Sequence, residues 1–277
     1  MDTIAIGGTD IAFRAIGEGT PILMLHGGYL DHRHMVSEME PAFDSGSGWR
    51  RIYPDLPGHG RTAVPDTCTS FDDMLDVVIA FADAVIGAQP FAVAGMSAGG
   101  HLVRGLVHKC PDRLRGVMIN AAPFEIDYAK RDLPAQIDIY EDAGFAVAAG
   151  DRLERMRNMQ PIRNMRYADW HETYFKPAFA ARDIAYSDHI WQPEHYNFSF
   201  PLTPVLPPFD APSLILAGRQ DVVVGYRDAV PRIDDYPRAT FAVLDAAGHM
   251  IEPARPALFQ ALVRDWLARM RLDGARP

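Results

Sequence analysis

The sequence predicts an α/β fold in which a mostly parallel sheet carries helices on both faces. Three observations lead to this prediction. Strand-like and helix-like segments alternate, several strand-like segments are continuous apolar runs, and these runs end in glycine-rich turns. A continuous apolar run is typical of a strand buried on both faces, and strict alternation is typical of parallel sheets. The length of 277 residues is enough for one large hydrophobic core.

The first part of the chain supplies the opening strands and one long helix. The predicted strands are residues 3–6, residues 11–15, the apolar run TPILMLHGG and a short segment that ends at Asp55. Residues 70–86 then have apolar positions at helical spacing. Ser70 is the expected N-cap of this helix, because it precedes two acidic residues that belong in the first turn.

The alternation continues and is then interrupted. PFAVAG predicts a strand, HLVRGLVHKC a helix and LRGVMINAA another strand. After Ala122 the pattern changes to amphipathic helical stretches, expected at residues 132–148 and 151–162. Strands return at APSLILAG and ATFAVL, and PALFQALVRDWLARMR closes the chain as a helix. We therefore expect a core formed by residues 1–122 and 206–277, with residues 123–205 inserted as a helical unit.

Charge and cysteine content narrow the class of protein. The net charge of −9 would repel nucleic acid and anionic membranes on average, so the expected partner is a small molecule. Cys68 and Cys110 show no metal-ligand spacing and are expected to be free thiols. Neither a signal peptide nor a membrane helix is expected, which favours a cytoplasmic protein. Exposed apolar surface on the inserted unit would favour a homodimer.

The segment GMSAGG places Ser97 in a Gly-x-Ser-x-Gly pattern between a predicted strand and a predicted helix. A serine nucleophile must project from the edge of the sheet, and a sharp strand-to-helix turn achieves this. The residues two before and two after it, Gly95 and Gly99, come so close to neighbouring backbone that glycine is almost required. Ser97 is therefore the candidate nucleophile.

A serine hydroxyl needs a base within hydrogen-bond reach, and the base needs an acid to orient it. His249 follows the predicted strand FAVL, and Asp221 follows the predicted strand LILAG. Loops at the carboxyl ends of parallel strands meet at one edge of the sheet, so the fold can bring both residues to Ser97. Asp245 is a rival acid, but it lies at the end of the strand itself.

An oxyanion formed by attack on a carbonyl must be stabilised by backbone N–H groups. Ala98, directly after Ser97, is expected to supply one donor, and Gly28 in the loop LHGGYLD is expected to supply the other. His26 in the same loop is expected to have a structural role, holding the turn by hydrogen bonds.

The segments LHGG, DLPGHGRT, GMSAGG, GRQD and AGHMIEP together resemble those of the α/β-hydrolase superfamily, in order and in spacing, over essentially the whole chain. The resemblance implies an eight-stranded, mostly parallel sheet, a helical cap over the site and no cofactor. It implies a triad of Ser97, Asp221 and His249, with Gly28 and Ala98 as oxyanion donors. It also implies that Asp55 and His59 belong to the scaffold.

The residue types favour one reaction within this superfamily. A serine at the turn excludes dehalogenases and epoxide hydrolases, which attack with aspartate. Hydrolases that cleave carbon–carbon bonds in ring-cleavage products tend to carry asparagine before the serine and tryptophan after the histidine, where this chain has Met96 and Met250. We expect a carboxylic-ester hydrolase for small to medium apolar substrates. Carbon–carbon hydrolysis, acyl transfer and non-catalytic binding of a small molecule remain alternatives.

The pocket is expected to be lined by apolar and aromatic side chains. The candidates are Tyr29, Met96, Phe124, Tyr128, Trp170, Trp191 and Met250, with Met156, Tyr174 and His195 as further possibilities. The run RLERMRNMQPIRNMR carries five arginines, which predict a solvated helix face or, alternatively, one arginine that binds a substrate carboxylate. Arg104 is expected to be a surface or packing residue.

Overall fold

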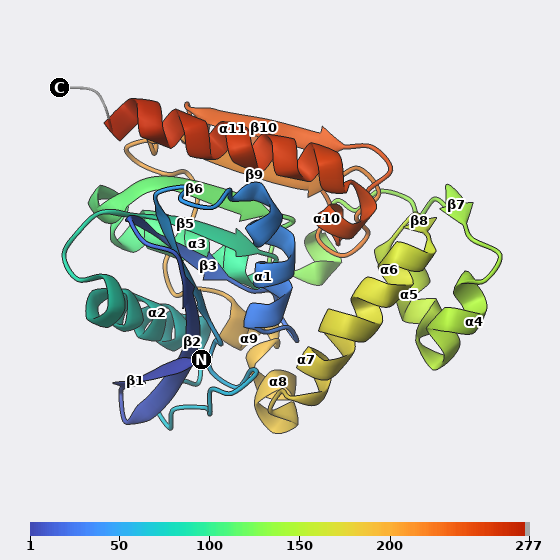
Figure 1. Cartoon of the computed structure of the whole chain (residues 1–277), viewed down its shortest axis with the longest axis horizontal. Helices are drawn as coiled ribbons and strands as arrows, with labels where there is room; N and C mark the ends of the chain where they lie inside the picture. The colour runs from blue at the N-terminus through green and yellow to red at the C-terminus, as the bar shows by residue number, and fades with distance from the viewer. Residues whose placement is uncertain (275–277) are drawn as a thin grey trace.

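The computed structural model describes residues 1–274 and contains a central eight-stranded sheet (Figure 1). Its strands, in chain order, are β1 (Asp2–Ile6), β2 (Thr9–Ile16), β3 (Thr20–Leu25), β4 (Trp49–Pro54), β5 (Phe91–Met96), β6 (Leu114–Asn120), β9 (Ser213–Gly218) and β10 (Ala239–Leu244). The spatial order is β1-β2-β4-β3-β5-β6-β9-β10. The pairs β1–β2 and β2–β4 are antiparallel, and all other pairs are parallel. The predicted fold class is confirmed.

Helices cover both faces of this sheet. On one face lie α1 (His32–Met39) and α11 (Pro256–Gly274), and on the other lie α2 (Phe71–Ile86) and α3 (Ala98–Lys109) (Figure 1). Successive side chains of a strand point to opposite faces. In β3, accordingly, Leu23 and Leu25 belong to the core beneath α2 and α3, whereas Ile22 and Met24 belong to the core beneath α1 and α11. All four are fully buried, which explains why the strand reads as a continuous apolar run.

The long helix α2 begins where the sequence predicts. The Ser70 hydroxyl accepts the backbone N–H of Asp73 at 3.2 Å, and the Asp73 carboxylate accepts the backbone N–H of Ser70 at 2.9 Å. These two bonds form a capping box. The helix ends at Gly87, whose positive φ of 77° stops the helical path. The short helix α1, capped by Asp31, is not among the predicted elements.

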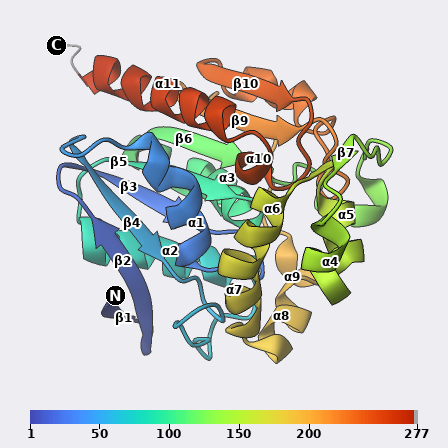
Figure 2. The same ribbon diagram turned by 45° about the vertical axis from the view of Figure 1, so that its right-hand side comes forward.

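The segment between β6 and β9 folds mainly into short helices. These are α4 (Phe145–Ala149), α5 (Leu153–Met159), α6 (Met165–Trp170), the π-helical turn His171–Phe175, α7 (Lys176–Ala180), α8 (Ile184–Ile190) and α9 (Pro193–Tyr196). Two short strands, β7 (Tyr140–Glu141) and β8 (Ile162–Arg163), pair in parallel. Figures 1 and 2 show these elements gathered beyond the carboxyl ends of the parallel strands.

The prediction of a helix at residues 132–148 is largely wrong. Only its last residues are helical, in α4, whereas residues 132–139 have no regular secondary structure and Tyr140–Glu141 form β7. The backbone N–H groups of Ile139 and Asp142 donate to the carbonyls of Pro161 and Arg163, both at 2.9 Å. Tertiary pairing with the segment around β8 therefore takes the place of a helix, whose continuity Pro134 would also interrupt.

Two further expectations concern the chain as a whole. Cys68 and Cys110 are both free, as predicted, and Cys68 is buried with its sulfur 3.1 Å from the Tyr186 hydroxyl. None of the helices formed by residues 1–274 combines the length and the apolar character needed to cross a bilayer.

Candidate active site

Ser97 occupies a tight turn between β5 and α3. Its φ and ψ of 51° and −115° are rarely adopted by a non-glycine residue, so the backbone is strained at this position. A side chain on Gly95 would overlap the carbonyl of Gly99, and one on Gly99 would overlap the carbonyl of Leu25. The two glycines therefore allow the strand, the turn and the helix to pack backbone against backbone, which projects Ser97 from the sheet edge.

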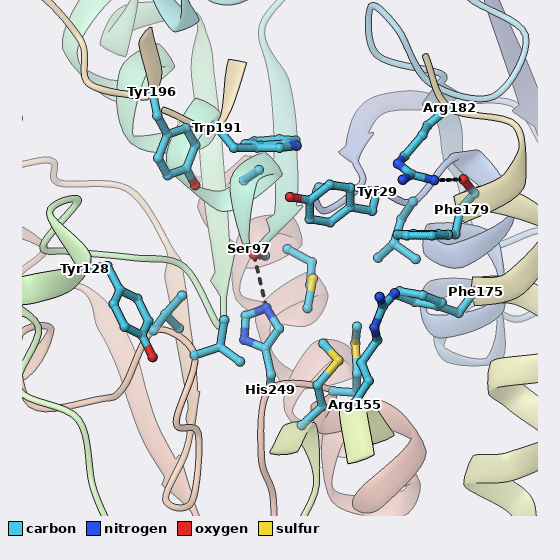
Figure 3. Close-up of a pocket in the computed structure, with 18 of the residues that line it drawn as sticks. Tyr29, Ser97, Tyr128, Arg155, Phe175, Phe179, Arg182, Trp191, Tyr196 and His249 are labelled. Atoms are coloured by element: carbon cyan, nitrogen blue, oxygen red, sulfur yellow. Dashed lines mark hydrogen bonds between the residues drawn. The ribbon is translucent and has the colours of Figure 1, made fainter. Parts of the chain in front are cut away.

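The structure brings the predicted nucleophile, base and acid into one hydrogen-bonded chain. His249 Nε2 lies 3.1 Å from Ser97 Oγ, the contact drawn in Figure 3, and His249 Nδ1 lies 2.9 Å from Asp221 Oδ2. Because a carboxylate only accepts, Nδ1 donates its proton to Asp221, and Nε2 accepts from the serine hydroxyl. Asp221 is fully buried, and its Oδ1 also accepts the backbone N–H groups of Val223 and Val224 at 2.8 and 3.1 Å.

The rival acid lies elsewhere. Asp245 directly follows β10 and is exposed, and its Oδ1 accepts the side-chain amide of Gln220 at 2.8 Å. The carboxylate that contacts the His249 ring is that of Asp221, as the sequence pattern predicts.

The loop that carries His249 is held by the inserted segment. The backbone N–H of His249 donates to the carbonyl of Met159 at 2.9 Å. The side chain of Gln160 bonds both neighbours of the histidine: its Oε1 accepts the N–H of Gly248 at 3.0 Å, and its Nε2 donates to the carbonyl of Met250. Gln160 is buried and was not predicted, because a single glutamine after a helix carries no sequence signal.

The two residues predicted to donate to the oxyanion, Ala98 and Gly28, line the same cavity as Ser97. Ala98 is the first residue of α3, so its N–H has no acceptor within the helix. Gly28 belongs to the loop after β3 and lines the same cavity as Ser97 and Ala98. A Cβ atom at Gly28 would lie 2.9 Å from the Trp191 ring, so a side chain there would displace this wall of the cavity.

His26 has the structural role expected of it. It is fully buried, its Nδ1 donates to the carbonyl of Gly27 at 2.8 Å, and its Nε2 accepts the N–H of Leu56 at 2.9 Å. Burial, with the neighbouring His59 as a second cause, lowers the pKa of His26 to about 3. A histidine that stays neutral and uses both ring nitrogens in this way holds the turn together.

The turn DLPGHGRT is likewise bonded as scaffold. Asp55 accepts the backbone N–H groups of His32 and Arg61, both at 2.9 Å, and His59 Nδ1 donates to the carbonyl of Pro57 at 2.8 Å. Asp31, His32 and Asp55 are close enough in space to suggest a cation site. However, His32 bonds Asp55 at 2.7 Å and Asp31 pairs with Arg33 at 2.5 Å, so these side chains are already engaged.

A cavity of about 650 Å³ opens onto Ser97 and His249. Five of the predicted side chains line it: Tyr29, Met96, Tyr128, Trp191 and Met250. The expectation for the other two is corrected by their packing. Phe124 lies outside the lining, beneath the guanidinium of Arg104 at 4.2 Å, and Trp170 is buried against His34 with ring centres 5.8 Å apart. The further candidates Met156, Tyr174 and His195 also lie outside the lining.

Sequence reasoning missed one wall of the cavity. It contains Phe175, which precedes α7, Phe179 within α7, and Arg182 from the turn that follows this helix. Figure 3 shows these side chains on the opposite side of Ser97 and His249 from Tyr128. Tyr29 adopts a positive φ of 63°, and its ring lies 5.9 Å from Phe179 and 5.5 Å from Trp191.

The arginine run resolves into two kinds of residue. Four of its arginines pair with carboxylates on other elements: Arg152 with Glu172, Arg157 with Glu141, Arg163 with Asp138 and Arg166 with Glu252, at 2.6 to 2.8 Å. They tie the inserted segment together and to the core. Arg155 is different, because it lines the cavity and no carboxylate within residues 1–274 pairs with it. Arg104, also in question, is buried and donates to the carbonyl of Pro123 at 2.7 Å.

This chain is similar to known hydrolases in both sequence and structure. A model of the alpha/beta hydrolase family matches residues 22–262. An alpha/beta superfamily hydrolase from Oenococcus oeni PSU-1 is 26% identical, with a TM-score of 0.88 and coverage of 98% of this chain and 100% of that one. A thermophilic esterase from Thermogutta terrifontis shares the fold, at 20% identity, a TM-score of 0.69 and 97% coverage of both chains. The uncharacterized hydrolase YcgS of Bacillus subtilis (strain 168) is 26% identical over 128 residues, which span 44% of this chain and 41% of that protein.

Proposed function

The chain belongs to the alpha/beta hydrolase family, and from this membership we propose that it is a serine hydrolase that cleaves carboxylic esters through an acyl-enzyme. The observation that carries the proposal is the hydrogen-bonded chain from Ser97 through His249 to Asp221, at 3.1 and 2.9 Å. These contacts are within the reach that proton transfer requires. Ser97 and His249 line a cavity whose volume is typical of small-molecule sites.

The first half of the proposed reaction forms the acyl-enzyme. Ser97 Oγ attacks the ester carbonyl carbon while its proton passes to His249 Nε2. The buried carboxylate of Asp221 stabilises the imidazolium that results. The negative charge that develops on the carbonyl oxygen is met by the N–H groups of Ala98 and Gly28. The intermediate then collapses, and His249 returns the proton to the departing alcohol.

The second half reverses these roles with water. His249 takes a proton from a water molecule, which attacks the acyl carbon and releases the carboxylic acid as Ser97 recovers its proton. If an alcohol occupied the place of water, the same steps would transfer the acyl group. Residues 123–205 act in this proposal as a cap, since α5, α7 and α8 contribute side chains to the cavity wall. The aromatic wall favours an apolar substrate body of small to medium size.

Hydrolysis of p-nitrophenyl acetate, butyrate and octanoate by the wild type and by Ser97→Ala tests the proposal. Turnover that disappears in Ser97→Ala, but persists in the exposed control Ser45→Ala, is the expected result. The chain-length profile then measures the pocket. Labelling by a fluorophosphonate probe shows whether Ser97 is reactive when no ester is turned over. A wild-type protein that neither turns over the esters nor takes the label contradicts the proposal.

A further inference from the structure

One wall of the cavity presents two guanidinium groups to the substrate space. The Arg182 guanidinium carbon lies 3.5 Å from the centre of the Phe179 ring, and that of Arg155 lies 4.7 Å from the same centre. In Figure 3 the ring is seen edge-on between the two guanidinium groups. Stacking on an aromatic ring holds each guanidinium plane but uses none of its N–H donors. The contact with the ring therefore occupies none of the N–H donors of either guanidinium group.

Neither arginine has a carboxylate partner within the described chain. The side chain of Arg155 makes no protein hydrogen bond among residues 1–274. Arg182 donates through Nη1 to the carbonyl of Phe179, and its Nε is buried without an acceptor. Arg131, the third arginine in the lining, contrasts with both, because its donors bond the carbonyls of Glu125, Ile126 and Val223.

The charge of the cavity is opposite to that of the protein. Among residues 1–274, Arg131, Arg155 and Arg182 line it together with a single carboxylate, Asp188, although the chain as a whole carries −9. Asp188 pairs with neither Arg155 nor Arg182 within ion-pair distance. Both arginines line the same cavity as Ser97, and neither gains an ion pair with a carboxylate among residues 1–274. A bound anion would satisfy the donors that the protein leaves open.

We propose that Arg155 and Arg182 form a subsite for a carboxylate on the substrate, so that the enzyme prefers esters that carry a negative charge remote from the bond cleaved. This inference rests on the proposed ester hydrolysis and refines the expectation of a wholly apolar substrate. A carboxylate matches the planar donor fork of an arginine. The nearby Asp188 opposes a dianion, so a singly charged carboxylate fits better than a phosphate.

Two pairs of esters in which a carboxylate replaces a methyl group test the preference. In the first, the mono-p-nitrophenyl ester of adipic acid is compared with p-nitrophenyl hexanoate, which places the charge on the acyl side. In the second, 4-acetoxybenzoate is compared with 4-methylphenyl acetate, which places it on the alcohol side. The measured quantity is the ratio of kcat/KM for the charged ester to that for the neutral ester. We expect a ratio above about ten in at least one pair, because the free energy of a charge-assisted hydrogen bond corresponds to a difference of at least about tenfold in kcat/KM.

Arg155→Gln and Arg182→Gln should each lower that ratio about tenfold. Arg157→Gln is the matched control, because Arg157 lies on α5 like Arg155 but pairs with Glu141 and lies outside the cavity lining. It should leave the ratio unchanged. Added salt should lower the wild-type ratio, since it screens a solvent-accessible charge pair. A ratio near one in both pairs overturns the subsite, as does a ratio that both glutamine variants retain.

Direct binding separates failure of the subsite from failure of the proposed reaction. Adipamate and hexanamide are uncleaved amides that differ in the same way as the first pair of esters. Calorimetric titration of wild-type protein should show tighter binding of adipamate, and Arg155→Gln and Arg182→Gln should remove the difference. If the esters are not turned over and the fluorophosphonate does not label Ser97, but adipamate is preferred, ester hydrolysis is wrong and the anion subsite stands. Equal or undetectable binding of the two amides in that case overturns the subsite as well.

Discussion

The carbonyl oxygen of Met159, the last residue of α5, accepts the backbone N–H of His249 at 2.9 Å. The next residue, Gln160, bonds the residues on both sides of that histidine. The loop that positions the His249 ring is therefore not built from the core alone. Its backbone is paired with a segment that enters the fold more than eighty residues earlier in the chain.

Removal of the Gln160 side chain should reduce turnover more than substrate affinity. In Gln160→Ala the N–H of Gly248 and the carbonyl of Met250 lose their partner, and a buried unpaired group costs about 1–3 kcal/mol. We expect kcat to fall about tenfold with a smaller change in KM, because a misplaced base affects the chemical step. Gln192→Ala is the control, since the exposed side chain of Gln192 donates to the carbonyl of Asp188 in α8 and not to the loop of His249. An unchanged kcat in a folded Gln160→Ala protein would show that the two hydrogen bonds of the Gln160 side chain do not position His249.

Ser97→Ala and His249→Ala should each remove nearly all turnover of the best p-nitrophenyl ester. The expected loss in kcat is on the order of 10⁶-fold, because the two residues act as one unit. The double variant should be no worse than either single variant. Clearly additive losses in the double variant would mean that the two side chains do not act together.

Substitution of Asp221 and of Asp245 should affect kcat very differently. Asp221→Asn should lower kcat by about 10⁴-fold, since an amide cannot orient and stabilise the imidazolium as a carboxylate does. Asp245→Asn should have little effect, because Asp245 is exposed and bonds Gln220 rather than His249. Steady-state kinetics of both variants check this assignment. It is wrong if the Asp245 change is the more damaging of the two.

The turn around Ser97 should tolerate no side chain on its glycines. In Gly99→Ala the new Cβ would overlap the Leu25 carbonyl, and a backbone shift would have to relieve the overlap. We expect a loss of about 2–3 kcal/mol and a melting temperature lower by about 5 °C or more. Gly144→Ala is the control, because its backbone is in the helical region and its nearest neighbour is Met165 at 3.7 Å. Thermal unfolding of Gly99→Ala at the wild-type temperature would contradict the close approach.

Acid should destabilise the protein in part through His26. Its pKa is lowered from 6.5 to about 3 by burial, so below pH 6.5 the unfolded chain binds a proton that the folded chain does not. Unfolding free energy should consequently fall as the pH falls, by up to about 1.4 kcal/mol per pH unit from this group. Urea unfolding at pH 7, 6 and 5 measures the slope. His26→Gln should be less stable at pH 7 but show a shallower slope, and an unchanged slope would exclude His26 as a source.

The sheet and the three residues at its edge could be predicted from the sequence because their signals are local. A strand buried on both faces, such as β3, must be apolar throughout, and the close backbone packing at Gly95 and Gly99 demands glycine at fixed positions. Asp221 and His249 lie in the loops that follow β9 and β10, so the parallel sheet brings them to Ser97 without any knowledge of side-chain packing.

The inserted segment could not be predicted to the same degree because its signals are not local. Its helices are 4 to 7 residues long, too short for a periodic pattern, and tertiary pairing decides where they end. Arg155 looks the same in sequence as its paired neighbour Arg157. Only the placement of α7 and the turn after it shows that Arg155 packs on Phe179 beside Arg182 in the same wall of the cavity.

The packing around Ser97 also bears on how this enzyme could be altered. The serine N–H donates to the Asn120 carbonyl at 2.8 Å, and its neighbouring glycines face carbonyls, so main-chain atoms hold the residue in place. The facing wall, in contrast, is made of side chains such as Tyr29, Phe175, Phe179 and Trp191. Libraries that randomise this wall can therefore search for new substrates while Ser97 keeps its position. The same separation would let natural divergence change specificity through single substitutions without rebuilding the turn that holds Ser97.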